Sequence, residues 1–426
     1  MKGSRLAIGI DVGTSGARAV AMDAAFVIVA QASARMSDFG ENGRDSSVWL
    51  KAVDSALGEL LRLVEAKRIV ALSVDGTSGT MLPVDKDGRP LADALMYSDR
   101  VQDRGILDAI VANAPATSAA HGPTSGLAKL MKFHQSSDVA RVVHQADWIS
   151  GQFSGRLDVS DENNSLKTGY DPVSRCWPDW IAEAGAALDL LPVVLAPGAP
   201  VGRIAEQAAK RFGLPGEVLM VAGTTDGCAS FRATGAETVG DAVTALGSSL
   251  TVKVLCDRPI FAPRYGIYSH RIDDLWLAGG ASNVGGKALA HYFSANQIVE
   301  LSKLIDAGTE TGLGFYPLLE KGERFPVADP DMPPRMEPRP ADDATFLKAI
   351  FEGISAVEAQ GYARLLELGG PALRSVRTVG GGARNPSWSQ IRQRRLGVTF
   401  LPALSEEAAA GTARLALKGA RQAGLL

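Results

Sequence analysis

The 426-residue chain has few cysteines, no long apolar run and little net charge. Its three cysteines, Cys176, Cys228 and Cys256, are widely separated, which excludes a disulfide framework and a cysteine zinc site and favours a reducing compartment. No apolar stretch of about 18 residues and no signal peptide is seen. The net charge of −3 gives no sign of a nucleic-acid or membrane-surface partner. These absences predict a cytoplasmic protein that binds neither nucleic acid nor membranes.

A P-loop is absent as well, because Gly285-Gly286-Lys287-Ala288 has neither the required spacing nor the final serine or threonine. The chain does have the composition of a well-cored globular protein, with 46% hydrophobic and 21% charged residues. Its length suits two or three domains, and two is the natural division.

The most informative segment is a turn rich in glycine and hydroxyl groups near the start. An apolar run ends at Asp11, turns through Gly13, Thr14 and Ser15, and then resumes, which predicts a β-hairpin with exposed backbone N–H groups. Such amides suit a phosphate, and the carboxylate beside them suits Mg²⁺. A similar turn recurs within residues 244–252. Two such turns, one in each half of the chain, indicate two related domains that grip one nucleotide.

The apolar periodicity predicts an α/β protein with mixed sheets. Residues 5–31 form three short apolar runs joined by tight turns, which is typical of an antiparallel meander. A helix with a serine cap is expected near 46–64, followed by a buried strand at 69–74. Further strands are expected at 81–84, 218–223, 269–270, 276–280 and 376–379, with a strand–turn–strand from Ala242. Further helices are expected from Asp342 or Asp343 and at about 406–420. The initial meander differs from the strict alternation of a dinucleotide-binding fold.

Four motifs, in this order along the chain, resemble those of the FGGY family of carbohydrate kinases. They are residues 11–15 (Asp-Val-Gly-Thr-Ser), 223–227 (Gly-Thr-Thr-Asp-Gly), 246–249 (Leu-Gly-Ser-Ser) and 380–385 (Gly-Gly-Gly-Ala-Arg-Asn). The resemblance covers essentially the whole chain.

This resemblance implies a two-domain α/β structure with the actin/Hsp70-like (ribonuclease H-like) ATPase fold and a cleft between the domains. We expect an N-terminal domain at 1–233 on the sugar side and a C-terminal domain at 234–405 on the nucleotide side. A C-terminal helix at 406–426 is expected to pack back on the N-terminal domain.

The resemblance also implies residue roles. Asp226 would be the general base that takes the proton of the sugar hydroxyl, and Asp11 would hold the Mg²⁺ that bridges the ATP phosphates. The other cofactor-binding residues would be Gly13, Thr14, Gly247 and Ser248 at the phosphates and Gly381, Gly382, Ala383, Asn385 and Trp388 around the adenosine. Structural alternatives stay open, since Asp226 also suits an Asx-turn and Trp388 also suits core packing.

Residues 75–80 (Asp-Gly-Thr-Ser-Gly-Thr) depart from the Gln/Met/His-type motif that many family members, xylulokinases among them, carry there. Small hydroxyls in place of bulky donors reshape the sugar pocket. In this respect the chain resembles the compact branch of the family, which is similar to D-ribulose kinase. The expected substrate-binding residues are Asp11, Ser15, Gly16, Arg18, Asp75, Ser78 and Asp226, with Ser15 and Gly16 on the side facing the nucleotide. The segment 97–99 is a further sugar-side candidate, and Arg18 is equally compatible with a surface position.

The function implied is an ATP- and Mg²⁺-dependent kinase, monomeric or homodimeric, that converts D-ribulose to D-ribulose 5-phosphate. One alternative is xylulokinase or another polyol or ketose kinase of the family. A second alternative, from a different class, is a non-catalytic actin-like regulator that binds nucleotide. Asp226 argues against the regulator, because such a protein has no sugar hydroxyl to deprotonate.

Overall fold

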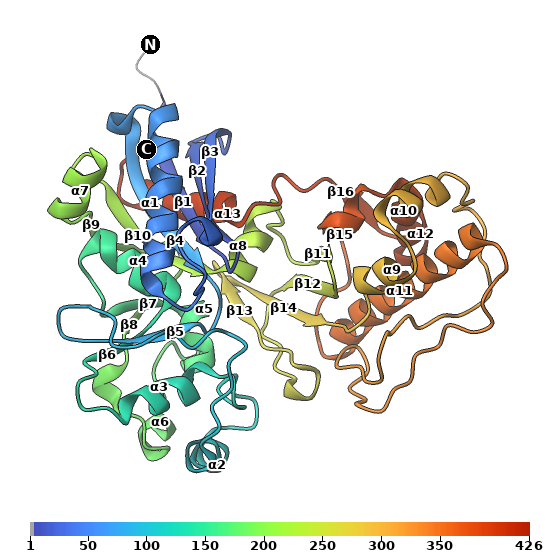
Figure 1. Cartoon of the computed structure of the whole chain (residues 1–426), viewed down its shortest axis with the longest axis horizontal. Helices are drawn as coiled ribbons and strands as arrows, with labels where there is room; N and C mark the ends of the chain where they lie inside the picture. Colours follow the sequence, from blue (N-terminus) through green and yellow to red (C-terminus); the bar gives the residue numbers. More distant parts are fainter. Residues whose placement is uncertain (1–3) are drawn as a thin grey trace. The chain divides into compact units, whose positions relative to one another are not determined.

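The computed structural model describes residues 4–426, which fall into two compact units (Figure 1). Unit 1 contains the chain up to Ala233 together with His270–Asp273 and Glu407–Leu426. Unit 2 contains Thr234–Ser269 and Asp274–Glu406. Within residues 4–426, no helix combines the length and the apolar composition needed to cross a membrane.

The sheet of unit 1 has the strand order β3-β2-β1-β4-β10-β9. The predicted meander is confirmed, because β1, β2 and β3 pair antiparallel in chain order, whereas β4 and β10 are added parallel to β1. The strands are β1 (Leu6–Val12), β2 (Gly16–Asp23), β3 (Ile28–Arg35), β4 (Ile69–Gly76), β9 (Pro200–Arg203) and β10 (Leu219–Thr225). Because β1, β4 and β10 are parallel, their carboxyl ends meet at one edge of the sheet.

Helices cover both faces of this sheet (Figure 1). Ile8 and Ile10 of β1 pack in the core with α1 (Ser46–Leu63), and Ala7 faces the opposite way into the core that α13 (Ala408–Gln422) completes. This alternation is the two-residue period of a strand buried on both faces. A methyl at Gly9 would overlap the backbone of α13, so glycine allows this helix to lie directly against the strand.

The helix α1 begins with a different cap from the one predicted. Its N-cap is Asp45, whose side chain accepts a hydrogen bond from the Ser47 N–H at 2.8 Å, and the serines already belong to the first turn. A carboxylate at this position accepts a hydrogen bond from one of the free amides of the first turn. Its negative charge also interacts favourably with the positive end of the helix dipole.

The rest of unit 1 consists of short helices and strands, which are labelled in Figure 1. They are β5 (Met81–Val84), α2 (Arg104–Asn113), α3 (Gly126–His134), β6 (Arg141–His144), α4 (Gln145–Ser154), β7 (Val159–Asp161), α5 (Glu162–Ser165), α6 (Trp180–Glu183), β8 (Val193–Leu195), α7 (Glu206–Phe212), α8 (Asp226–Ala233) and β13 (His270–Ile272). The predicted strand at 81–84 pairs with β6 in a separate two-stranded sheet.

Unit 2 repeats the pattern of unit 1. Its strands run in the order β14-β12-β11-β15-β16, with β11, β12 and β14 antiparallel in chain order and β15 and β16 parallel to β11. The strands are β11 (Asp241–Leu246), β12 (Leu250–Cys256), β14 (Leu275–Ala281), β15 (Ser375–Val379) and β16 (Thr399–Leu401), and the helices are α9 (Gly286–Tyr292), α10 (Ala295–Ser302), α11 (Asp343–Glu367) and α12 (Pro386–Leu396). The predicted cap of the long helix is confirmed, because Asp342 accepts from the Thr345 N–H at 2.8 Å.

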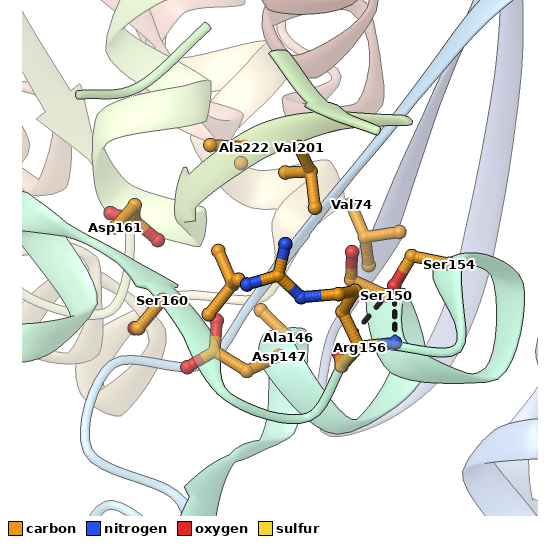
Figure 2. Close-up of a pocket in the computed structure, with 12 residues that line it drawn as sticks. Val74, Ala146, Asp147, Ser150, Ser154, Arg156, Ser160, Asp161, Val201 and Ala222 are labelled. Carbon is orange, nitrogen blue, oxygen red and sulfur yellow. Dashed lines mark hydrogen bonds between the residues drawn. The ribbon is translucent and has the colours of Figure 1, made fainter. Parts of the chain in front are cut away.

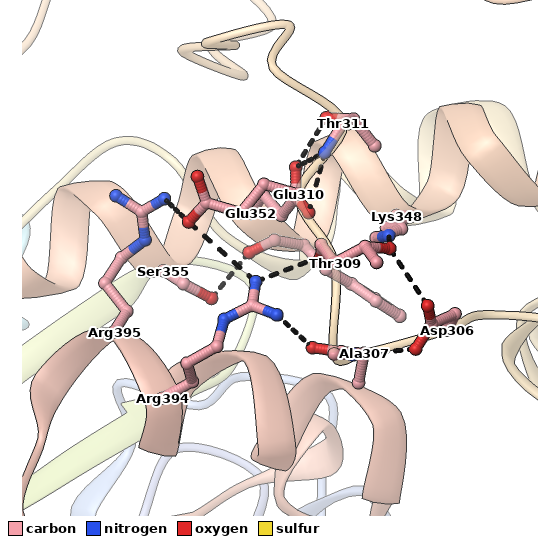
Figure 3. A network of polar contacts seen from close by, with 12 residues as sticks. Asp306, Ala307, Thr309, Glu310, Thr311, Lys348, Glu352, Ser355, Arg394 and Arg395 are labelled. Carbon is pink, nitrogen blue, oxygen red and sulfur yellow. Dashed lines mark hydrogen bonds and ion pairs between the residues drawn. The ribbon is translucent and has the colours of Figure 1, made fainter.

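Polar contacts tie the segment 306–311 to two helices of unit 2 (Figure 3). Lys348 of α11 donates to the Thr309 hydroxyl at 2.8 Å, and Glu352 accepts from the Thr311 N–H at 3.1 Å. Arg395 of α12 pairs with Glu310 at 3.2 Å. These side-chain contacts hold the irregular segment 306–311 in place, where no β-ladder of backbone hydrogen bonds does so.

A buried ion pair joins α11 to α12 in the same unit. Arg392 and Glu358 are both almost completely buried and form a two-pronged contact with both N···O distances at 2.7 Å. The hydroxyls of Thr244 and Thr378 complete the shell around the pair. Two planar groups held this way are fully hydrogen-bonded, which is what a buried pair requires.

Candidate active site

Carboxylates gather at the carboxyl edge of the unit 1 sheet. Asp11, near the end of β1, lies opposite Asp75 of β4 in the parallel register, and Asp75 lies opposite Thr224 of β10. Asp226 then begins α8 directly after β10. The folding of three parallel strands therefore brings together acids from three distant parts of the sequence.

Asp11 is buried and paired with a cation. The Arg18 guanidinium lies 3.2 Å from its carboxylate and also contacts Glu407 at 3.2 Å. Burial raises the pKa of Asp11, and the Asp75 hydrogen bond and Arg18 oppose that rise. Arg18 therefore holds a carboxylate in place at the position predicted for a metal ligand.

Asp75 does not fit the predicted role of direct sugar contact. Its side chain is completely buried, accepts a hydrogen bond from the Thr412 hydroxyl of α13, and lies beside Asp11. Burial and the neighbouring Asp11 charge raise its pKa well above the ordinary value. The correction follows from α13, whose Thr412 covers the Asp75 carboxylate on the face of the sheet that Asp11 shares.

The turn between β1 and β2 has the shape predicted for a phosphate site. The Gly13 N–H donates to the Gly16 carbonyl at 3.0 Å, and Thr14 and Ser15 are exposed. Gly16, however, is buried and paired in the sheet, and a methyl there would lie 2.6 Å from the Ala34 oxygen. Glycine at this position allows the close approach of β2 to β3, and its predicted contact with substrate stays a prediction.

Asp226 is partly buried at the start of α8. One of its carboxylate oxygens accepts from the Gly227 N–H at 2.7 Å, as expected of an acid at a helix N-terminus. The preceding strand is tied to α5, because the Asn163 side-chain amide donates to the Thr224 hydroxyl at 2.9 Å.

The segment after β4 carries hydroxyls with contrasting surroundings. Thr77 donates from both its N–H and its hydroxyl to the Gln145 carbonyl oxygen, at 3.0 and 2.8 Å, and its hydroxyl lies 2.6 Å from that of Thr80. The Ser78 hydroxyl is buried yet has no hydrogen-bond partner among the described residues. A buried polar group without a partner is a candidate for binding a ligand oxygen.

Lys129 is a structural residue of this region that the sequence analysis missed. It is completely buried on α3 and donates to the carbonyls of Gly79 and Met96, both at 2.7 Å. Burial lowers its pKa to about 8. The only local signal is a lysine between apolar residues, at Ala128 and Leu130. In the segment 97–99, Asp99 is already paired with Arg44.

In unit 2 the predicted nucleotide residues lie at the equivalent strand ends. Gly247 and Ser248, in the turn after β11, are exposed, and their carbonyls accept from the N–H groups that open α9 at 2.8 and 3.1 Å. Gly381, Gly382 and Ala383 form a 3₁₀ turn after the neighbouring parallel strand β15. Gly380 before them has a φ of 88° and packs on Leu246, so it requires glycine.

Two residues predicted around the adenosine have structural roles. Trp388 is only 2% exposed, stacks on Phe351 at 4.7 Å, and donates its ring N–H to the Ser355 hydroxyl at 3.2 Å. Its ring therefore belongs to the core of unit 2 and cannot stack on a nucleobase, which corrects the prediction. Asn385 caps α12, accepting from the Trp388 N–H at 3.0 Å and donating to Ser302 at 2.7 Å.

A small cavity in unit 1 is bordered by Val74 of β4 and Ala222 of β10 (Figure 2). Asp147, Ser160 and Asp161 line it, and burial raises the pKa of Asp147 well above its usual value and that of Asp161 to about 6. Its free space is about that of one water molecule, which is too small for a sugar. Asp161 instead caps α5, accepting from the N–H groups of Asn163 and Asn164 at 2.9 and 3.1 Å.

Two family models match the chain. Residues 6–120 match the N-terminal domain, and residues 242–420 the C-terminal domain, of the FGGY family of carbohydrate kinases. The chain belongs to the FGGY family of carbohydrate kinases. Membership makes this FGGY kinase an ATP-dependent sugar phosphotransferase and confirms that part of the prediction.

Individual relatives and solved structures agree with the family. The FGGY kinase is 23% identical to the xylulose kinase of Staphylococcus epidermidis over 409 residues, which cover 90% of this chain and 82% of the relative. It is also similar to a xyloylose kinase from Brucella ovis, with a TM-score of 0.84, 24% identity and coverage of 98% and 91% of the two chains. For the xylulose kinase from Lactobacillus acidophilus the values are 0.82, 19%, 99% and 90%. These likenesses confirm the predicted α/β fold of this FGGY kinase.

Proposed function

We propose that this FGGY kinase transfers the γ-phosphoryl group of ATP to the 5-hydroxyl of D-ribulose. The observation that carries the choice of sugar is the Ser78 hydroxyl, which is buried without a partner in a segment of small hydroxyl residues. A sugar hydroxyl would satisfy it, and a site built for such pairing rejects sugars that leave its groups unpaired.

Asp226 is proposed as the general base. Its carboxylate accepts the proton of the sugar hydroxyl while that oxygen bonds to the γ-phosphorus and the bond from this phosphorus to the bridging oxygen of ADP breaks. Support comes from its position at the end of β10, on the sheet edge that also carries Asp11. Phosphoryl transfer needs positioning and charge neutralisation more than covalent chemistry, so one base and a few donors suffice.

Mg²⁺ is proposed to bind at Asp11. Among the described residues, no group of three or more histidine, cysteine or acidic side chains could hold a metal. Nucleotide-bound Mg²⁺ needs only one or two carboxylates together with phosphates and water, and a carboxylate fixed by Arg18 fits that donor set. When bound, the ion would neutralise phosphate charge. Thr14 in unit 1 and Ser248 in unit 2 are proposed to donate to phosphate oxygens from their exposed turns.

The second candidate substrate is D-xylulose, because xylulose kinases are among the relatives. Coupled measurement of ADP release across pentuloses, hexuloses and polyols separates the two. We expect the highest kcat/KM with D-ribulose; a tenfold preference for D-xylulose would overturn the sugar assignment and leave the kinase assignment intact. The proposed cytoplasmic location rests on the sparse cysteines.

The base is tested with Asp226→Asn, which keeps the size of the side chain but cannot accept a proton at neutral pH. General-base catalysis typically contributes about 10²–10⁴-fold, so kcat should fall by that factor while ATP binding changes little. Asp108→Asn is the matched control, because Asp108 is exposed on α2. Retention of more than about a tenth of the rate by Asp226→Asn would place the base elsewhere.

A further inference from the structure

Lys167 is the cation that the proposed mechanism leaves unexplained. It lies in the 3₁₀ turn Leu166–Thr168, directly after α5. This turn is firmly held, because Asp161 caps α5 and the Asn163 amide bonds to Thr224, two residues before Asp226. The backbone that carries Lys167 is therefore fixed relative to the proposed base.

The side chain of Lys167 extends along the segment after β4. Its δ-carbon lies 3.8 Å from the point where a Cβ on Gly79 would be, so it runs beside the residue that follows Ser78. Lys167 is only partly exposed, and among residues 4–426 its ammonium has no hydrogen bond or ion pair. Burial lowers its pKa, and the negative charge of Asp226 acts in the opposite direction.

An ammonium in this setting needs acceptors that the protein does not supply. Lysine has three donor protons and no acceptor, and largely desolvated charges are normally paired. Lys129, which is buried nearby, shows the contrast, because two carbonyls satisfy it at 2.7 Å. The Ser78 hydroxyl in the adjoining segment also has no partner. Two unsatisfied polar groups therefore flank Gly79, in the same unit as Asp226.

We propose that Lys167 is a positioning residue whose ammonium donates a hydrogen bond to an oxygen of the sugar, beside the hydroxyl that Asp226 deprotonates. This inference rests on the proposed function and adds the ligand for a residue that no motif identified. The expected partner is a keto or hydroxyl oxygen acting as acceptor. Ser78, which can donate or accept, would bind a neighbouring hydroxyl.

The test compares Lys167→Met with Lys167→Arg, and uses Lys51→Met, an exposed position on α1, as the control. Removing a charged donor should raise the KM for D-ribulose by about 10- to 100-fold, with the KM for ATP and the melting temperature nearly unchanged. Lys167→Arg should retain part of the affinity, because it keeps the charge and the donors. Lys51→Met should leave both KM values as they are.

Two results would overturn the inference. One is a sugar KM within twofold of wild type in Lys167→Met. The other is an unchanged sugar KM with a lower kcat and a shifted pH profile, which would mean that Lys167 acts on Asp226 and not on the sugar. If Lys167→Met does not fold, the same comparison is made with Lys167→Gln by calorimetric titration of D-ribulose without ATP. Failure of the proposed function is distinguishable, because wild type would then prefer D-xylulose at least tenfold or show no activity with D-ribulose, whatever the variants do.

Discussion

The imidazole of His144 offers a quantitative test of packing in unit 1. His144 is 2% exposed, and its Nδ1 has no hydrogen-bond partner among the described residues. Its Nε2 lies 3.3 Å from the Thr168 hydroxyl. Burial, together with the positive charge of Lys129, lowers the pKa of His144 to about 3. The folded protein therefore keeps this ring neutral through the whole range in which an exposed histidine becomes charged.

The sign and size of the effect follow from that difference. An unfolded histidine binds a proton below pH about 6.5, but the folded ring does not until about pH 3. Acid therefore favours the unfolded chain, and the contribution of His144 to the free energy of unfolding is lost as the pH falls from 6.5 toward 3. One pKa unit corresponds to about 1.4 kcal/mol, so the loss between pH 7 and pH 5 is about 2 kcal/mol.

The assay is urea unfolding of the full chain at pH 7 and pH 5, comparing wild type with His144→Gln. Groups common to both proteins cancel, including Asp161, whose raised pKa has the opposite effect on stability. The variant should lose about 2 kcal/mol less than wild type over this interval. A difference between the two proteins that does not change with pH would refute the reasoning, as would an NMR signal of His144 that titrates near pH 6.5.

Two further predictions concern packing. Arg392→Met leaves the Glu358 carboxylate buried without its cation and should lower the free energy of unfolding by about 3–5 kcal/mol, measured with denaturant. Adding Glu358→Leu should recover most of this loss. Equal losses in the single and double variants would contradict the prediction. Gly411→Ala places a methyl into the Ala229 carbonyl and should lower stability by at least about 1–3 kcal/mol, whereas Gly58→Ala, in open space on α1, should be neutral or stabilising in the same thermal melts.

Turn chemistry and strand periodicity are local properties, which is why the meander and both hairpin turns could be predicted from the sequence. The turn at Gly13 is closed by a local hydrogen bond to Gly16, and the turn at Gly247 joins two strands that are adjacent in the sequence, β11 and β12. The same holds for the Asp342 cap.

Residue environments set by distant segments could not be predicted. Trp388 becomes a core residue because Phe351 of α11 supplies its stacking partner. Asp75 is buried because α13, hundreds of residues later in the chain, packs on it and its Thr412 donates a hydrogen bond to the carboxylate. Lys129 and Lys167 gave no signal, because a single lysine in a helical segment is usually a solvated surface residue.

The placement of α13 has a consequence for how the protein is made. The strands of the unit 1 sheet are complete by Thr225, yet the helix that covers one face begins at Ala408. A ribosome adding about 5–20 residues per second needs roughly 10–40 s to synthesise what lies between. During that interval apolar side chains such as Val20 and Val221 lack their cover, and unit 2, which ends at Glu406, is completed only just before the helix itself. The nascent chain thus exposes an apolar face of the sheet, which a chaperone or the final helix must cover.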